Sequence, residues 1–328
     1  MAALDVERLR NENYNAAVES VRHVHEELMV IRVRPELERP AFVAGQYTLL
    51  GLGAWEPRND GVTRPAPTHS TGDADTAKAS ERKKDLGQSL IRRAYSISCP
   101  LIDDLGRMVT VDQIEYLEFF ITLVRKPTDE PPVLTPRLFA LGAGDRLFLG
   151  PHPHGRYTLE AISEQENVIF IATGTGEAPH NAMIAELLAR GHGGRIFSVV
   201  SVRERKDLAY LEQHREIERR FSNYRYIVIT TREPENLDRS HPNYVGKVHV
   251  QDYFATGRFQ TEAGGEIRPE NTHLFLCGNP MMIGLPHKGK EGDLLYPEPA
   301  GMVETLTHMG YQLDEPRHPG NVHFEKYW

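Results

Sequence analysis

The chain has 328 residues, which is enough for about two domains at the usual ~100–200 residues per domain. Its 40% hydrophobic and 26% charged residues exclude a disordered or collagen-like protein. The formal net charge of −8 argues against nucleic acid as a partner, because nucleic-acid-binding surfaces are basic. Two cysteines, Cys99 and Cys277, are too few for a disulfide framework or for a four-thiolate zinc or iron–sulfur site.

No stretch of the sequence approaches the ~20 consecutive apolar residues that a membrane-spanning helix needs. Residues 1–15 carry charged side chains, including Asp5 and Arg8, and lack the apolar core of a secretory signal. We therefore expect a cytoplasmic protein without a membrane span. The sequence does not determine its oligomeric state.

From Asn15 to about Thr158, short β-prone segments follow one another with glycine and proline between them and almost no helical period. This pattern is typical of an antiparallel β-barrel or sandwich. The segments that we expect to form strands are 17–22, 28–33, 42–52, 94–98, 117–124 and 145–149.

From Asn167 onward, apolar segments alternate with segments of helical period, which indicates a parallel, doubly wound sheet. The boundary should lie between Tyr157 and Glu166, so we expect domains at 1–158 and 159–328. The expected strands are 168–172, 195–202, 226–230 and 274–277, and the expected helices are 181–189, 208–221 and 248–254.

Two polar segments fit neither pattern. Residues 54–88 are rich in proline, glycine, threonine, serine and charge, and residues 285–299 are shorter and similar. Each is either a functional surface loop or a partly disordered insertion.

A glycine turn, Thr173-Gly174-Thr175-Gly176-Glu177-Ala178-Pro179, directly follows the expected strand 168–172. Backbone N–H groups in such a turn, at the start of a helix, can approach an anionic phosphate. Pro179 stands where the common dinucleotide fingerprint has its third glycine. Taken alone, the turn is equally compatible with a tight strand–helix connection that holds no ligand.

A second motif, Arg92-Arg93-Ala94-Tyr95-Ser96-Ile97, lies on an expected strand of the first domain. Alternation places Arg93 and Tyr95 on one side of that strand and Ala94 and Ser96 on the other. The guanidinium could pair with a phosphate, the ring could stack on a planar group, and the hydroxyl could donate a hydrogen bond. Taken alone, the motif is better explained as an edge strand with solvated arginine and tyrosine side chains.

The order of these motifs resembles that of the ferredoxin–NADP reductase family. Arg93-Ala94-Tyr95-Ser96, the glycine turn, Cys277-Gly278-Asn279-Pro280 and the ending Phe324-Glu325-Lys326-Tyr327-Trp328 follow one another as in bacterial members that end in Tyr-Trp. The resemblance covers roughly residues 15–328. It implies an antiparallel β-barrel domain that binds FAD, followed by an α/β domain with a parallel five-stranded sheet that binds NADP(H).

The resemblance also implies which residues contact FAD. Arg93, followed by Ala94, would bind the pyrophosphate, Tyr95 would stack on the isoalloxazine ring, and Ser96 would lie near flavin N5. Further FAD contacts would come from Thr135 at the pyrophosphate, from Phe120 and Thr122 beside the ribose and adenine, and from Trp328 near the adenine.

For NADP(H), the family's pyrophosphate cradle corresponds to the glycine turn, and its 2′-phosphate arginines correspond to Arg203 and Arg232. Lys247 is better explained as a solvated side chain. The residues implied for this cofactor are Gly174, Thr175, Gly176, Pro179, Arg203, Arg232, Gly278, Asn279 and Pro280.

Four residues would act at the reaction centre by resemblance. Ser96 and Cys277 would position the flavin and the nicotinamide, Glu325 would help proton movement, and Tyr327 would cover the flavin until the nicotinamide displaces it. Read from the residues alone, Cys277 is a small buried apolar side chain and the ending is an amphipathic final strand.

Fifteen histidines invite a search for a metal site. His23 and His25, and likewise His152 and His154, are spaced to share a strand face, but no thiol or acidic ligand set stands beside them. The HExxH signature is absent as well. We therefore expect surface histidines and no metal.

The reaction implied is hydride exchange between NADP(H) and FAD, coupled to single-electron exchange with ferredoxin or flavodoxin. Such acidic carriers would need a local basic face, for which the candidates are Arg82, Lys83, Lys84, Arg92, Arg125 and Lys126. Three alternatives stay open: an NAD(P)H–flavin reductase, a reductase for another acceptor, and a non-catalytic FAD-binding regulator. The sequence does not identify the physiological carrier, the direction of electron flow or the role of the two insertions.

Overall fold

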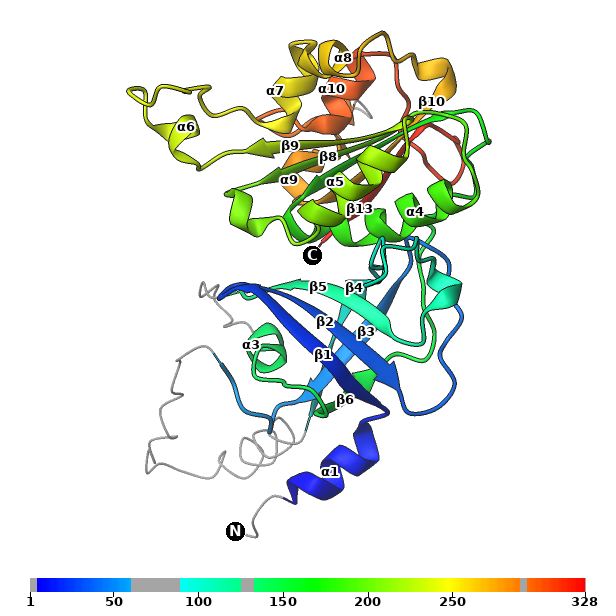
Figure 1. Ribbon diagram of the computed structural model, residues 1–328, viewed down its shortest axis with the longest axis vertical. Helices are drawn as coiled ribbons and strands as arrows, with labels where there is room; N and C mark the ends of the chain where they lie inside the picture. The colour runs from blue at the N-terminus through cyan, green and yellow to red at the C-terminus, as the bar shows by residue number, and fades with distance from the viewer. Residues whose placement is uncertain (1–4, 60–88, 125–132, 290–293, 328) are drawn as a thin grey trace. The chain divides into compact units, whose positions relative to one another are not determined.

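The computed structural model describes residues 5–59, 89–124, 133–289 and 294–327 (Figure 1). The chain forms two compact units, each with its own sheet. Unit 1 comprises Met1–Phe42, Tyr47–Ser96 and Glu115–His154, and unit 2 comprises Val43–Gln46, Ile97–Ile114 and Gly155–Trp328. Among the described residues, no helix is long and apolar enough to cross a membrane.

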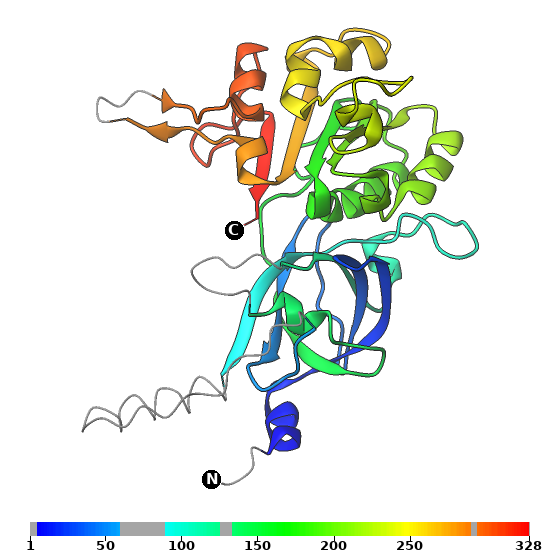
Figure 2. The ribbon, with the colours of Figure 1, turned by 90° about the vertical axis from the view of Figure 1, so that its left-hand side faces the viewer.

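Unit 1 is built on one antiparallel six-stranded sheet in the order β4-β3-β6-β1-β2-β5. Figure 2 shows the sheet curling around its own core, where Ile31, Leu50 and Phe119 are fully buried. The predicted antiparallel domain is therefore confirmed. Its strands are β1 (Ala16–His25), β2 (Leu28–Pro35), β3 (Tyr47–Gly53), β4 (Leu90–Ser96), β5 (Leu117–Thr122) and β6 (Arg146–Leu149).

Unit 1 also contains two helices that the sequence pattern did not predict, α1 (Val6–Asn13) and the single turn α3 (Thr135–Leu138). The Asp5 side chain caps α1 by accepting a hydrogen bond from the Arg8 N–H at 3.1 Å. Arg10 of this helix pairs with the buried Glu56 carboxylate at 2.6 and 2.9 Å. This pair ties α1 to the chain just beyond β3.

Unit 2 is built on a parallel five-stranded sheet in the order β13-β10-β7-β8-β9, as predicted. The central strand β7 is buried on both faces, which explains its continuous apolar sequence. The strands are β7 (Asn167–Thr173), β8 (Ile196–Val202), β9 (Tyr224–Thr230), β10 (Thr272–Gly278) and β13 (Val322–Lys326).

The two faces of this sheet differ in chemistry. One face packs an almost wholly apolar core, including Ile169 and Ile171, against the helices α7 (Val250–Ala255), α8 (Arg258–Glu262) and α10 (Met302–His308). The opposite face is covered by α4 (Glu177–Ala189) and α5 (Leu211–Arg220) (Figure 1). That face buries polar side chains from both helices and the strands, among them Glu177, His180, Asn181, Ser198 and His214.

Several boundaries differ from those predicted. Helix α4 begins at Glu177 rather than 181, because Pro179 fits the first turn of a helix and does not end it. The predicted helix 208–221 is the shorter α5, preceded by a 3₁₀ turn at Arg205–Asp207. The remaining elements are 3₁₀ turns at Val111–Gln113, Gly174–Gly176 and Pro269–Asn271, α6 (Pro234–Leu237), α9 (Pro280–Ile283), β11 (His287–Lys288) and β12 (Leu294–Leu295).

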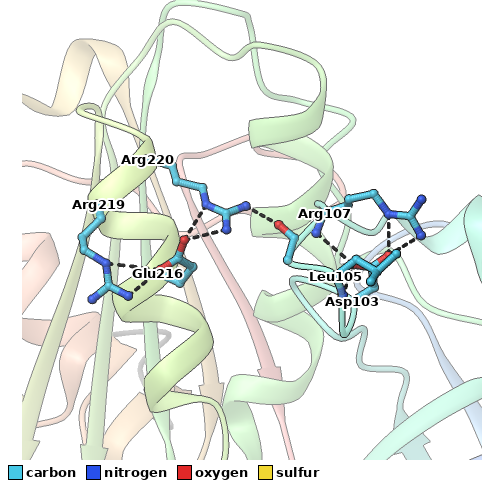
Figure 3. A network of polar contacts seen from close by, with 7 residues as sticks. Asp103, Leu105, Arg107, Glu216, Arg219 and Arg220 are labelled. Carbon is cyan, nitrogen blue, oxygen red and sulfur yellow. Dashed lines mark hydrogen bonds and ion pairs between the residues drawn. The ribbon is translucent and has the colours of Figure 1, made fainter.

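Residues 97–114 pack against α5 through polar contacts (Figure 3). Arg220 donates to the Gly106 carbonyl while pairing with Glu216, and the Leu101 N–H donates to the Gln213 side chain at 3.0 Å. The loop is closed by an Asp103–Arg107 pair at 2.7 Å. These contacts anchor to unit 2 the segment that directly follows Ser96.

Part of the first insertion (residues 60–88) and part of the second (290–293) lie outside the described residues. The β11/β12 hairpin, orange in Figure 2, belongs to the second insertion. Five candidates for a basic face and one FAD candidate also fall outside: Arg82, Lys83, Lys84, Arg125, Lys126 and Trp328.

Candidate functional site

The glycine turn connects β7 to α4 in unit 2. Strand β7 ends at Thr173, residues Gly174–Gly176 form one 3₁₀ turn, and α4 begins at Glu177. Gly174 has φ +53°, a left-handed conformation that favours glycine. A Cβ on Gly176 would lie 2.3 Å from the Cys277 carbonyl oxygen, so only glycine fits where the turn meets β10.

The Cys277-Gly278-Asn279-Pro280 motif forms the end of β10 and lies against this turn. The Asn279 N–H donates to the Thr173 hydroxyl at 2.8 Å. Gly278 has φ +124°, and a Cβ on it would lie 2.4 Å from the same hydroxyl oxygen. Asn279 then caps the short helix α9 by accepting from the Met281 N–H at 2.9 Å.

The C-terminal motif completes the same corner of unit 2. Glu325 lies opposite Cys277 in the parallel pairing of β13 with β10. The Tyr327 N–H donates to the Gly278 carbonyl at 3.2 Å, and its hydroxyl donates to the Thr175 carbonyl at 3.1 Å. Three motifs that are far apart in sequence therefore meet within one unit.

Burial determines the protonation of the two titratable groups in this corner. Cys277 is fully buried, and its burial together with the nearby charge of Glu325 raises the pKa of the thiol well above its usual value. The thiol is therefore protonated and not a nucleophile. Burial also raises the pKa of Glu325 to about 7, and its Oε2 is buried with no hydrogen-bond partner among the described residues. This carboxyl can hold or release a proton near neutral pH.

Two arginines lie at the ends of neighbouring strands of unit 2. Arg203 follows β8, Arg232 follows β9, and the Arg232 N–H donates to the Arg203 carbonyl at 2.8 Å. Both side chains are exposed and make no ion pair within the described part of the chain. By contrast, Arg205 pairs with Glu235 at 2.8 Å and Lys206 pairs with Glu204 at 2.7 Å. Lys247 is exposed, like the two arginines.

The predicted flavin residues of unit 1 lie on β4, which stands at one end of the sheet order and pairs with β3. Arg93 and Ala94 are exposed, Tyr95 is half-buried and Ser96 is buried. Burial raises the pKa of Tyr95, partly offset by the charge of Arg93. Arg93 itself donates to the Arg92 carbonyl at 2.8 Å, which leaves most of its donors available.

The other predicted FAD residues of unit 1 differ from one another in their burial. Thr135 opens α3 and accepts a hydrogen bond from the Val124 N–H at 3.2 Å. Thr122 is exposed at the end of β5, whereas Phe120 is buried in the core of the unit.

The histidine pairs lie on the surface or near it. His23, His152 and His154 are exposed and His25 is half-buried. Within residues 5–59, 89–124, 133–289 and 294–327, no cluster of three or more His, Cys, Asp or Glu side chains could hold a metal ion.

A buried polar cluster behind the glycine turn was not predicted from the sequence. Glu177 accepts a hydrogen bond from the Tyr226 hydroxyl at 2.7 Å and lies 3.0 Å from His214 Nε2. His214 stacks on Tyr226 with ring centroids 4.0 Å apart, and its Nδ1 is 2.7 Å from the Tyr224 hydroxyl. The signal that could have indicated it is Glu177, a charged residue between the glycine turn and the apolar residues of α4.

Comparisons with known proteins found relatives of both the sequence and the fold. Residues 170–288 match the family model of the oxidoreductase NAD-binding domain. The chain is 26% identical over 168 residues, 51% of its length, to the flavodoxin/ferredoxin–NADP reductase of Escherichia coli, of which 63% is covered. It is also 26% identical over 272 residues to the enzyme of that name from Rhodobacter capsulatus, covering 80% of this chain and 79% of that one.

The fold agrees with these relatives. The crystal structure of a ferredoxin NADP+ reductase from Neisseria gonorrhoeae with bound FAD and NADP aligns with 95% of this chain and 97% of that one, at a TM-score of 0.66 and 18% identity. The chain therefore has the ferredoxin reductase-like fold, and its sequence is similar to reductases of this kind.

Similarity to these reductases does not by itself fix the electron acceptor. Another relative, one subunit of the Na+-translocating NADH-quinone reductase of Psychrobacter arcticus, is 23% identical over 262 residues, 77% of this chain. The match spans 57% of that protein, and matches to two further curated relatives span 66% and 63% of their lengths. Similarity to this chain therefore extends to reductases of more than one named activity.

Proposed function

We propose that this protein is a flavoenzyme that exchanges hydride between NADP(H) and FAD and single electrons with ferredoxin or flavodoxin. The observation that carries the proposal is the convergence of three motifs in unit 2. The Asn279 N–H on the Thr173 hydroxyl and the Tyr327 hydroxyl on the Thr175 carbonyl join the glycine turn, the end of β10 and the C-terminus.

FAD would be held by residues 1–158. The fit rests on β4, where an exposed Arg93 guanidinium and a half-buried Tyr95 ring stand on a strand at the end of its sheet. The guanidinium can pair with a pyrophosphate and the ring can stack on a planar heterocycle. Bound FAD would supply the chemistry of accepting a hydride and passing on single electrons. Ser96 and Thr135 would donate hydroxyl hydrogen bonds to it, and Thr122, Phe120 and Trp328 complete the predicted set.

NADP(H) would be held by residues 159–328. The Gly174–Gly176 turn lies at the start of α4 and packs closely against β10. Backbone N–H groups at such a helix start can bind a pyrophosphate. Arg203 and Arg232 are exposed and unpaired within the described residues, whereas their basic neighbours are engaged by carboxylates. Two free guanidinium groups at adjacent strand ends suit a 2′-phosphate, which favours NADP(H) over NAD(H).

The reaction centre of unit 2 would position the nicotinamide and transfer a proton. The protonated Cys277 thiol is small and uncharged, so it can shape the nicotinamide site without repelling an electron-rich ring. Glu325 would take up or release a proton, since its pKa is about 7. The Tyr327 hydroxyl donates a neutral hydrogen bond to the Thr175 carbonyl, and a bond of this kind is worth roughly 0.5–1.5 kcal/mol. Displacement of the C-terminal ring would break it.

An acidic electron carrier needs a basic docking face on a protein whose net charge is −8. Of the candidates, Arg92 lies among the described residues. It is exposed on β4 next to Arg93, and its guanidinium lies 4.5 Å from the centre of the Phe148 ring. Both cysteines are free, which is compatible with a reducing, cytoplasmic compartment.

A second candidate function is reduction of a different acceptor, such as free flavin or a partner oxygenase. It is favoured by a 30% identity over 146 residues to the phenol hydroxylase P5 protein of Acinetobacter pittii. The test is NADPH-dependent reduction of ferredoxin, flavodoxin and free flavin at increasing ionic strength. Carrier reduction that is fastest at low salt supports the proposal. Reduction of free flavin alone, without salt dependence, would favour the second candidate.

A further inference from the structure

Tyr157 and His180 form a buried hydrogen-bonded pair on the polar face of the sheet of unit 2. The Tyr157 hydroxyl is 2.7 Å from His180 Nε2, and both side chains are buried. The Tyr157 ring packs edge-on against Phe275 of β10, with centroids 5.3 Å apart, and His180 of α4 lies 5.0 Å from the Phe170 ring of β7. The pair thus lies between α4 and the strands β7 and β10.

The same face of the sheet carries Glu325. Phe275 and Cys277 are two residues apart on β10, so they point to one side, and Glu325 is the register partner of Cys277. Burial raises the pKa of Tyr157, and the acidic groups of Cys277, Glu325 and Tyr327 raise it further when they are ionised, which is consistent with a phenol hydroxyl close to those three groups.

The hydrogen-bond requirements of His180 decide which way the pair is oriented. Burial lowers the pKa of His180 to about 3, so the ring is neutral and carries one N–H. His180 Nδ1 is buried and has no partner among the described residues. A buried N–H without an acceptor is rarer in proteins than an acceptor without a donor. The ring should therefore keep its proton on Nε2 and donate it to the Tyr157 oxygen.

That tautomer leaves the Tyr157 proton in need of an acceptor. Glu325 Oε2 is buried and lacks a donor within the described residues. A buried carboxylate oxygen without a donor is costly, and a phenol proton is a strong donor to such an oxygen. The two unsatisfied groups can complement each other across one bridging water.

We propose that Tyr157, held by His180, is a positioning residue that turns its hydroxyl proton toward Glu325 when that carboxyl is ionised. When Glu325 is protonated, it needs no donor from Tyr157. The pair thereby makes it easier for Glu325 to release its proton during turnover. This inference rests on the proposed role of Glu325 in proton movement.

Among the residues that the structure describes, few other groups could donate a proton to Glu325 in this way. His323 lies two residues before it on β13, but its nitrogens face His273 at 2.9 Å and Asp314 at 3.1 Å. The other described titratable groups near Glu325 are Cys277 on β10, Tyr327 after β13 and His180 on α4. Lys326, the next residue along the chain, is exposed.

The test is an infrared pH titration of the protonated Glu325 carboxyl in the purified protein with its bound cofactor, the band being assigned with Glu325→Gln. Tyr157→Phe keeps the ring on Phe275 and removes the donor, so the titration midpoint should rise by about one pH unit, a tenfold change. Tyr311→Phe is the matched control, because it removes another buried hydroxyl on the apolar face of the same sheet. It should leave the midpoint unchanged.

An unchanged midpoint in Tyr157→Phe would overturn the proposal. If that variant does not fold, ring ¹⁵N spectra of His180 in the wild type decide the matter. A proton on Nε2 is expected, and a proton on Nδ1 contradicts the proposal. Neither readout needs turnover, so the two proposals can fail separately. A protein that fails to oxidise NADPH but passes both tests would refute the proposed function and still show that Tyr157 donates to Glu325.

Discussion

A Cβ atom on Gly176 would lie 2.3 Å from the carbonyl oxygen of Cys277, so the turn after β7 and the end of β10 touch through backbone atoms. Neither backbone can give way without shifting a strand. Gly176→Ala should therefore destabilise the protein by about 1–3 kcal/mol and weaken NADP+ binding at least tenfold. Urea unfolding and calorimetric titration measure the two effects.

The control for that substitution is Gly174→Ala. Gly174 has φ +53°, and a Cβ added to it would meet no atom within 4 Å, so alanine there is strained without a clash. We expect a cost of about 1 kcal/mol and weaker loss of NADP+ binding. Equal losses of binding in both variants would contradict the role given to the contact between the turn and β10.

Arg203→Ala tests the proposed 2′-phosphate site. Because a charge-assisted hydrogen bond contributes about 1.5–3 kcal/mol, kcat/KM for NADPH should fall about tenfold to a hundredfold, and that for NADH should change little. Arg205→Ala is the matched control, since Arg205 already pairs with Glu235. If the NADPH/NADH ratio is the same in wild type and Arg203→Ala, the assignment is wrong.

Glu177→Ala tests the buried cluster under the glycine turn. The substitution removes the acceptor of the Tyr226 hydroxyl and the carboxylate that lies 3.0 Å from His214 Nε2, in a site where all three side chains are buried. We expect a loss of about 3–5 kcal/mol in the free energy of unfolding, as for other broken buried pairs. Glu186→Ala, on the same helix but partly exposed, should cost less than about 1 kcal/mol. Similar losses for both variants would show that the cluster contributes no stability.

Glu325→Gln tests the pH dependence. The folded-state pKa of about 7 lies above the unfolded value of ~4.3, so protonation favours the folded state and stability falls as pH rises between those values. The slope is at most about 1.4 kcal/mol per pH unit. Glutamine should abolish this slope and lower kcat at least tenfold. Urea midpoints from pH 5 to 8 check the first effect, and a variant with an unchanged slope would contradict it.

The sequence predicted both sheets because their residue patterns are local. The continuous apolar segment 168–172 predicts a strand that is buried on both faces. The alternation of apolar and helical segments after Asn167 predicts a parallel sheet, and neither prediction needs distant residues. Helix α1 was missed, and its Arg10–Glu56 contact could not be predicted from a local pattern, because the two residues are 46 positions apart.

The candidate site, like the fold, could be predicted from the sequence only in part. Short motifs indicated Gly176, Cys277 and Tyr327, but only the tertiary structure brings them to one corner of unit 2. Tyr157 and His180 were missed because their significance lies in a 2.7 Å contact across 23 residues, on a face that the apolar pattern of β7 predicts to be ordinary core.

An anaerobic titration tests most directly whether this chain passes hydride from NADPH to a bound flavin. The purified protein, reconstituted with FAD if needed, is mixed with NADPH in the absence of any acceptor, and the flavin absorbance is followed. We predict bleaching by about one equivalent of NADPH, with slower and weaker bleaching by NADH. A protein that cannot hold FAD, or whose flavin stays oxidised in excess NADPH, would contradict the proposed function.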